Sequence, residues 1–175
     1  MATVPKTPEM FGRRVIYSSA DIITRANVID ELARAKTTHA LNQAEIDYLY
    51  RYYKGDQPIL QRVKTVRPDI CNRIVENIAY EIVSFKTGYI FGEPIQYVRK
   101  GDHASEDILK LNEYMESEDK AAQDKELADW FHICGTAYRM VLPGEEKPFE
   151  IDTLDPRYSF VIYNNGFKKR PLAGV

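Results

Sequence analysis

The sequence predicts an α+β fold in which amphipathic helices pack on a small, mostly antiparallel sheet near the C-terminus. Apolar residues recur at spacings of three and four, as on one face of a helix, from about residue 21 to residue 134. Beyond this point the apolar period changes to two, which is typical of strands. The Asn164-Asn165-Gly166 segment, which follows an apolar run, is a typical hairpin turn.

The first 20 residues are predicted to form a flexible N-terminal arm, because they contain prolines and a glycine without apolar periodicity. Residues 21–175 are expected to form one α+β domain. Its last residues, 171–175, look like a return strand that stops as it begins. We therefore expect this domain to be truncated at its C-terminus.

Two amphipathic helices are expected between Asp21 and Gly55. The first carries an apolar stripe at helical spacing, and a polar link over residues 36–39 follows it. The second begins at Asn42, where Glu45 three residues later completes a capping box. Gly55 supplies the left-handed conformation at which many helices end. The stripe of the first helix consists of Ile22, Ala26, Ile29 and Ala33.

The next helix is predicted over residues 68–88 and is the most apolar in the chain. Its apolar residues cover more than one stripe, so we expect it to be buried on most of its girth. Tyr89 and Phe91 follow it and are expected to fill the core between this helix and the sheet. Pro94 then prevents a helix and starts a short strand over residues 95–98.

Two further helices and three strands complete the predicted elements. One helix spans residues 106–115, and another spans residues 119–134. Strands are expected over residues 137–142, around residues 149–153 and over residues 158–163. The inner face of the last helix is assigned to Leu127, Trp130, Phe131 and Cys134.

Charge balance and cysteine content exclude several classes of protein. Lys and Arg number 24 and Asp and Glu number 26, which gives a net charge of -2 and argues against a surface devoted to nucleic acid. Two cysteines are too few for a disulfide framework, so we expect a reduced, intracellular protein. Charges interrupt the long apolar stretches, so no membrane span is expected. The 12 tyrosines suit subunit interfaces, which combine packed surfaces with polar margins.

No motif in the sequence indicates an enzyme, a metal site or a cofactor. Cys134 and His132 lie roughly 200° apart around a helix, so they do not face each other as a nucleophile and its base. A small intracellular hydrolase that uses Cys134 and a stand-alone helical nucleic-acid-binding module stay as alternative functions. The basic run Lys168-Lys169-Arg170 is assigned to a solvated hairpin tip, with a partner contact as the alternative.

Five segments of the chain form an ordered set. They are residues 51–55 (RYYKG), 72–77 (NRIVEN), 86–94 (KTGYIFGEP), 131–138 (FHICGTAY) and 154–163 (LDPRYSFVIY). In this order they resemble the N-terminal part of the portal proteins of long-tailed bacteriophages, of the siphophage type found in phages and prophages of Gram-positive bacteria. The resemblance covers roughly residues 42–175. The signature positions that it implies are structural ones: Tyr53, Gly55, Asn72, Gly88, Tyr89, Phe91, Gly92 and Pro94.

The resemblance implies a structural subunit without a cofactor rather than an enzyme. Portal proteins form a homo-oligomeric ring, usually a dodecamer, at one capsid vertex, and double-stranded DNA is packaged and ejected through this head-tail connector. The implied partners are capsid and scaffolding proteins, terminase and a head-completion adaptor, with no membrane. The implied locations are the portal vertex of the virion and, during assembly, the host cytoplasm. The chain corresponds to much of the wing, the peripheral α+β domain, and no position matches the channel-lining stem, the clip or the tunnel loop.

Three tyrosines are the predicted subunit contacts of such a ring: Tyr48, Tyr52 and Tyr53. Their helix already uses Ile46 and Leu49 for its core face, so the tyrosine side chains are expected to be available to a neighbouring subunit. Replacing Tyr52 by serine is accordingly expected to weaken ring formation.

Overall fold

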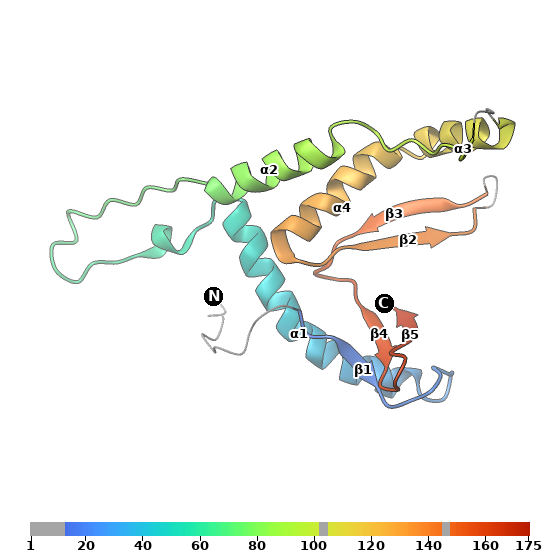
Figure 1. Cartoon of the computed structure of the whole chain (residues 1–175). Helices are drawn as coiled ribbons and strands as arrows, with labels where there is room; N and C mark the ends of the chain where they lie inside the picture. The colour runs from blue at the N-terminus through green and yellow to red at the C-terminus, as the bar shows by residue number, and fades with distance from the viewer. Residues whose placement is uncertain (1–12, 102–104, 145–147) are drawn as a thin grey trace.

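The computed structural model describes residues 13–101, 105–144 and 148–175, and it confirms the α+β class (Figure 1). The elements in these ranges are four α-helices, one short 3₁₀ helix and five strands. In chain order they are β1 (Ile16–Ser18), α1 (Val28–Tyr53), η1 (Pro58–Gln61), α2 (Ile78–Phe91), α3 (Glu106–Ser117), α4 (Lys120–Cys134), β2 (Tyr138–Leu142), β3 (Glu150–Leu154), β4 (Val161–Asn164) and β5 (Pro171–Gly174).

The strands form two small sheets. β4 is the central strand of one sheet, where it pairs in parallel with β1 and antiparallel with β5. β2 and β3 form a separate antiparallel hairpin, in which Tyr138 lies opposite Leu154 and Leu142 lies opposite Glu150. The mostly antiparallel strands near the C-terminus are therefore confirmed. The strand predicted over residues 95–98 is wrong, because that segment joins neither sheet.

α1 connects the two hydrophobic clusters of the core. Its first half packs on the three-stranded sheet and its second half packs on α4 (Figure 1). At a rise of about 1.5 Å per residue, its 26 residues span roughly 39 Å and so reach both clusters. The first cluster consists of Ile16, Ala35, Phe160 and Ile162. The second consists of Ile46, Trp130 and Cys134.

α1 is one continuous helix, so the predicted division into two helices is wrong. The helix begins at Val28, later than predicted, and the polar link predicted over residues 36–39 lies inside it. His39 is buried inside this helix. Its Nε2 atom lies 3.0 Å from the Arg157 carbonyl oxygen, and its ring centroid lies 4.5 Å from that of Phe160, so the side chain has both a polar and an aromatic partner. A polar side chain with such partners belongs to the core, although its residue type alone suggests a link.

Polar contacts hold the segment before β1 against α1, so the predicted flexible arm is wrong for residues 13–20. Arg13 and Arg14 form ion pairs of 2.6 and 2.7 Å with the buried Glu45. The Asn42 side chain accepts a 3.0 Å hydrogen bond from the Arg14 amide and donates a 2.9 Å hydrogen bond to the Arg14 carbonyl oxygen. Asn42 therefore binds an extended segment instead of capping a helix. The rest of the predicted arm lies outside the described residues.

Replacing Asn42 by alanine should lower the free energy of unfolding by about 1–3 kcal/mol, because it removes the partners of two backbone groups of Arg14. Chemical denaturation followed by circular dichroism measures this change. Thr37→Ala, at an exposed position of the same helix, is the control and should change the free energy by no more than about 0.5 kcal/mol. Equal losses in the two variants would contradict the assigned role of Asn42.

α2 is shorter and more exposed than the helix predicted over residues 68–88, so the prediction of a largely buried helix is wrong. It begins at Ile78, where the Asn77 side chain accepts a 3.3 Å hydrogen bond from the Tyr80 amide. This N-terminal cap, rather than the proline at residue 68, fixes the start of the helix. The buried side chains of α2 are Val83 and Thr87.

α3 and α4 lie close to their predicted positions. Asp119, with φ 51°, separates the two helices, and Gly135, with φ 73°, ends α4 as predicted. Trp130 and Cys134 are buried as predicted, but Phe131 is 58% exposed. The first turns of α4 face β3, with a side-chain hydrogen bond to its backbone, whereas the last turns pack on α1. The buried residues of α4 therefore do not lie on a single stripe along the helix.

Candidate functional site

α2 carries an apolar stripe on a face that the rest of the chain leaves exposed. Its side chains are spaced four, three and four residues apart and so lie on one side of the helix. Phe85 and Tyr89 are 73% and 83% exposed, and their ring centroids lie 6.2 Å apart. Ile78 and Ile82 are each 50% exposed. We call these four residues, Ile78, Ile82, Phe85 and Tyr89, the α2 stripe.

The exposure of Tyr89 corrects the prediction that it fills the core together with Phe91. The helix does not stop at Gly88, so Tyr89 continues the stripe that contains Phe85, whereas Phe91 is half-buried at the helix end. An apolar helix of this kind requires cover on more than one side. α4 covers one side of α2 and leaves the α2 stripe exposed.

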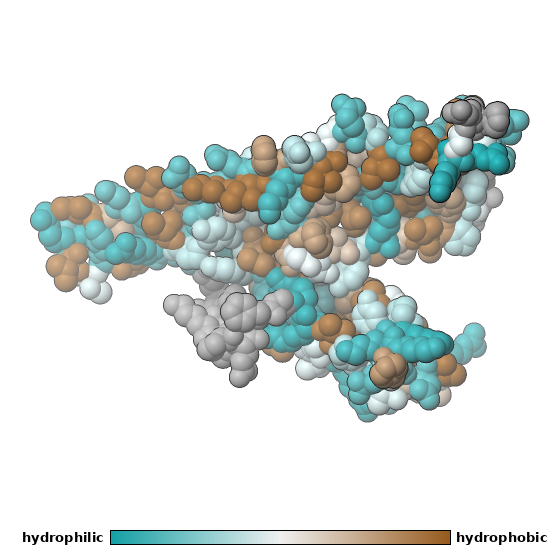
Figure 2. All heavy atoms as spheres, viewed as in Figure 1, coloured by the Kyte–Doolittle hydropathy of each residue, from teal (hydrophilic) through white to brown (hydrophobic). Residues whose placement is uncertain are grey.

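The segment before α2 adds to this apolar surface. Residues 62–77, which we call the extended arm, form neither helix nor strand and reach away from the body of the molecule (Figure 1). Lys64 Nζ donates a 2.8 Å hydrogen bond to the Ile70 carbonyl oxygen, so two parts of the arm are hydrogen-bonded to each other. Figure 2 shows hydrophobic residues along both the arm and the neighbouring helix. The exposed apolar side chains of the arm are Val63, Val66, Ile70 and Ile74.

The exposed apolar area is large enough for a protein–protein contact. At roughly 150–250 Å² for a large side chain, the α2 stripe and the extended arm together expose about 900 Å². A specific interface buries about 800 Å² on each partner. This surface therefore has the size that one side of an interface needs.

Polar contacts anchor α2 to two other helices. The Thr87 hydroxyl donates a 2.7 Å hydrogen bond to the Asp129 carboxylate and lies 3.4 Å from His132 Nδ1. The Asn77 side chain donates a 2.8 Å hydrogen bond to the Tyr53 carbonyl oxygen at the end of α1. Burial, followed by the charge of Asp129, raises the pKa of Tyr53, so this phenol stays neutral between the helices. The α2 stripe is thus presented on a fixed helix.

The cluster of Thr87, Asp129 and His132 joins two helices and lacks the arrangement of a nucleophile with its base. The Thr87 hydroxyl gives its hydrogen bond to the carboxylate, whereas a nucleophile would give it to the imidazole. The sequence places Asp129 and His132 three residues apart, on one face of a helix, but does not indicate that Thr87 on another helix joins them.

The predicted subunit-contact tyrosines separate in the structure. Tyr48 and Tyr52 lie one turn apart on α1, are 38% and 36% exposed and have ring centroids 6.4 Å apart. Tyr53 is buried, with its ring 5.4 Å from that of Tyr80 on α2. A contact role for Tyr48 and Tyr52 stays a prediction. Most of the surface of Tyr53 is packed against other residues of the same chain, which leaves little of it for a neighbouring subunit.

The remaining signature residues lie on α2 and on the segments that flank it. Gly55 turns the chain after α1 with φ 89°, a conformation that strains other residues. Asn72 is exposed on the extended arm. Gly88 lies within α2, Gly92 caps its end, and Pro94 lines a surface pocket. The structural role of these positions stays a prediction.

Cys134 is poorly placed for nucleophilic chemistry. Its side chain is buried, and its thiol lies 3.0 and 3.2 Å from the carbonyl oxygens of Trp130 and Thr136. Burial raises the pKa of this thiol, which disfavours the reactive thiolate. His132 contacts Thr87 on α2. These observations weigh against the hydrolase alternative.

A thiol reagent should modify Cys71 faster than Cys134 in the folded protein, because burial both shields the Cys134 thiol from the reagent and disfavours its reactive thiolate. Cys71 is only half-buried on the extended arm, whereas Cys134 is buried with a raised pKa. Mass spectrometry of the modified peptides measures both rates. Denaturant should make the two rates similar. Rapid modification of Cys134 in the folded protein would restore the hydrolase alternative.

Metal-ligand geometry and membrane-spanning helices are both absent from the described residues. In residues 13–101, 105–144 and 148–175, no group of three His, Cys, Asp or Glu side chains is arranged to hold a metal ion. Over the same residues, no helix combines the length and the apolar character needed to cross a membrane.

Comparison with known proteins links this fold to one family. The family described as "Phage portal protein, SPP1 Gp6-like" matches residues 32–175. A search of the curated proteins finds no match to the chain. The matched range includes nearly all of α1, the extended arm, α2 and every later element. The match covers most of the chain, and the chain therefore belongs to the SPP1 Gp6-like family of phage portal proteins.

Proposed function

We propose that this chain is the wing part of a phage portal subunit and that it has a structural role in a homo-oligomeric ring. Double-stranded DNA is packaged and ejected through such a ring. Membership of the portal family supports the structural role. The single observation that carries the assembly role is the exposed α2 stripe, since an apolar face on an anchored helix needs a partner.

A second copy of the chain is the proposed partner of the α2 stripe and the extended arm. Their exposed apolar area, about 900 Å², matches what one partner contributes to a specific interface. In a ring, each subunit contacts its two neighbours through two different surfaces. The extended arm reaches away from the body and can therefore contact a neighbouring copy (Figure 1).

The further roles that we propose rest on the family alone. The ring, usually a dodecamer in this family, would lie at the portal vertex of the virion after assembly in the host cytoplasm. Its partners would be capsid and scaffolding proteins, terminase and the head-completion adaptor.

Sedimentation velocity and negative-stain electron microscopy over a concentration series test the assembly role. We expect reversible self-association with a Kd between about 1 μM and 1 mM, and ring-shaped particles at the highest concentrations. A chain that remains monomeric up to about 1 mM would contradict the proposal.

A further inference from the structure

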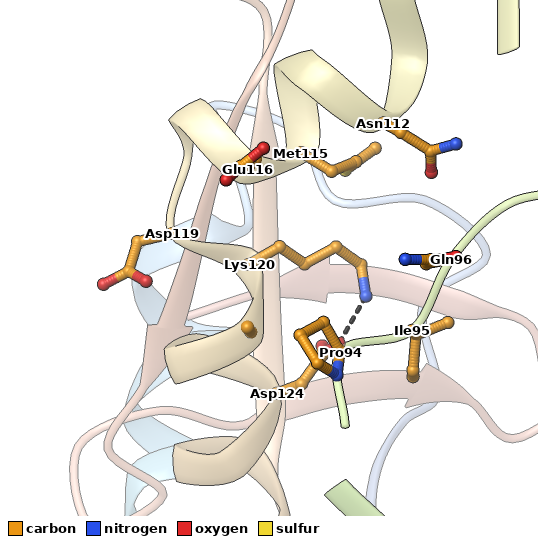
Figure 3. Close-up of a pocket in the computed structure, with 10 residues that line it drawn as sticks. Pro94, Ile95, Gln96, Asn112, Met115, Glu116, Asp119, Lys120 and Asp124 are labelled. Carbon is orange, nitrogen blue, oxygen red and sulfur yellow. Dashed lines mark hydrogen bonds and ion pairs between the residues drawn. The ribbon is translucent and has the colours of Figure 1, made fainter. Parts of the chain in front are cut away.

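A pocket with a volume of 410 Å³ opens between the segment after α2 and the junction of α3 with α4 (Figure 3). Three of the charged side chains that line it are acidic, and one, Lys120, is basic. Glu116 and Asp119 are exposed to solvent, whereas Asp124 is buried and paired with Lys120. The apolar part of the lining consists of Pro94, Ile95, Met115 and Ala121. A pocket of this chemistry suits an apolar side chain that is flanked by positive charge.

The walls of the pocket are fixed by hydrogen bonds and ion pairs. The Asn112 side chain accepts a 2.9 Å hydrogen bond from the Tyr97 amide and donates a 3.0 Å hydrogen bond to the Tyr97 carbonyl oxygen, which holds the segment after α2 on α3. Asp124 also forms a 2.7 Å ion pair with Arg139 on β2. These contacts preorganise part of the wall, which lowers the entropic cost of binding.

The tip of the β4–β5 hairpin has the complementary chemistry. Phe167 is 102% exposed, and the three basic residues that follow it are also exposed. The Lys169 amide donates a 3.1 Å hydrogen bond to the Gly166 carbonyl oxygen, which gives the turn a defined shape. We call residues 167–170, Phe167-Lys168-Lys169-Arg170, the basic tip.

The basic tip and the pocket lie far apart on one molecule. In the view of Figure 1 the β4–β5 hairpin lies at the bottom, whereas α3 lies at the upper right. The tip of a chain therefore cannot fill the pocket of the same chain. A contact that joins two different surfaces of identical subunits is heterologous, and its repetition can close a ring.

We propose that the basic tip of one copy docks in this pocket of the next copy, an inference that rests on the proposed ring assembly. The Phe167 ring occupies the apolar part of the pocket, beside Ile95. The positive charges of the tip then lie beside Glu116 and Asp119. Their attraction fixes which surfaces meet and orients the two copies.

Disulfide cross-linking between two different variants tests this contact. In a Cys71→Ser background, one protein carries Phe167→Cys and the other carries Ile95→Cys. An equal mixture should form at least about tenfold more cross-linked dimer than either protein alone, because docking raises the local thiol concentration. Ile29→Cys, on α1 outside both proposed contact surfaces and 77% exposed, replaces Ile95→Cys in the control mixture. A yield no higher than in this control would overturn the proposal.

Charge reversal provides a second measurement on the same cross-link. Replacing Lys168 and Arg170 by glutamate should lower the yield of the mixed dimer by about tenfold. Replacing Glu116 and Asp119 by lysine on the other protein should restore the yield, because the opposite charges meet again. Unchanged yields in the first mixture, or no recovery in the second, would count against the charge contact.

The cross-linking and assembly measurements together distinguish a failure of the docking proposal from a failure of the ring assembly. If the wild-type chain self-associates but the Phe167→Cys and Ile95→Cys variants do not cross-link, the docking of the basic tip is refuted and the ring assembly stands. If the wild-type chain does not associate and the two variants do not cross-link, both proposals are refuted.

Discussion

Replacing Phe85 by aspartate should weaken self-association by about 30-fold or more, because the central aromatic of an interface contributes about 2 kcal/mol or more. Phe85 is 73% exposed and stacks on Tyr89, so the folded monomer loses little when it is replaced. In the assembly, however, the new carboxylate would be buried without a partner. Sedimentation velocity measures the association, and circular dichroism checks that the monomer stays folded.

Ser84→Asp is the matched control for this variant. It adds the same charge to an exposed position of α2 that lies outside the α2 stripe. The control should associate as the wild type does, within a few-fold. If Phe85→Asp associates as tightly as Ser84→Asp, the α2 stripe is not the assembly surface.

Replacing Trp130 by alanine should lower the free energy of unfolding by about 3–5 kcal/mol, which is the usual cost of removing a large buried aromatic. Trp130 is 7% exposed in the cluster that joins α1 to α4. Its ring centroid lies 5.0 Å from that of Tyr50, and the Arg157 guanidinium lies 5.5 Å from the Trp130 ring. The substitution removes all of these contacts together. Chemical denaturation monitored by circular dichroism measures the loss.

Phe131→Ala is the internal comparison, because Phe131 is the next residue of the same helix and is 58% exposed. Its replacement should change the free energy of unfolding by no more than about 1 kcal/mol. The sequence pattern placed Trp130 and Phe131 on the same inner face, so it predicts similar losses. If the two variants lose similar free energies of unfolding, the result would support the sequence pattern and contradict the exposure of Phe131 in the structure.

Local signals in the sequence predicted the elements of the second half of the chain well. α4 ends at Gly135 because the left-handed conformation that it adopts suits glycine. The β4–β5 hairpin follows from the turn residues at Asn164-Asn165-Gly166 and from alternating apolar residues. Each of these features depends on a few neighbouring residues, which explains why the sequence alone reveals them.

Features that depend on distant partners could not be predicted in this way. β1 is part of a sheet because it pairs with β4, near the other end of the chain. Asn42 and Glu45, which lie 28 to 32 positions further along the sequence, bind the two arginines that precede β1. α1 is continuous because His39 has partners near the other end of the chain. In both cases the local pattern indicated a break or an arm, and tertiary contacts decided the result.

The candidate site was missed for a different reason. The helix predicted over residues 68–88 contains Ile78, Ile82 and Phe85, three of the four residues of the α2 stripe, but the rule that an apolar helix is buried assigned their cover to the same chain. In the folded monomer α4 covers only one side, and Phe85 and Tyr89 remain exposed. Sequence periodicity indicates that a face needs cover and does not indicate which molecule provides it.

The position of α2 in the assembled particle is the most direct test of this account. Electron cryomicroscopy of the assembled protein should place Ile82, Phe85 and Tyr89 at the contact between neighbouring subunits, excluded from solvent. An assembled ring in which these three side chains still face solvent would contradict the account.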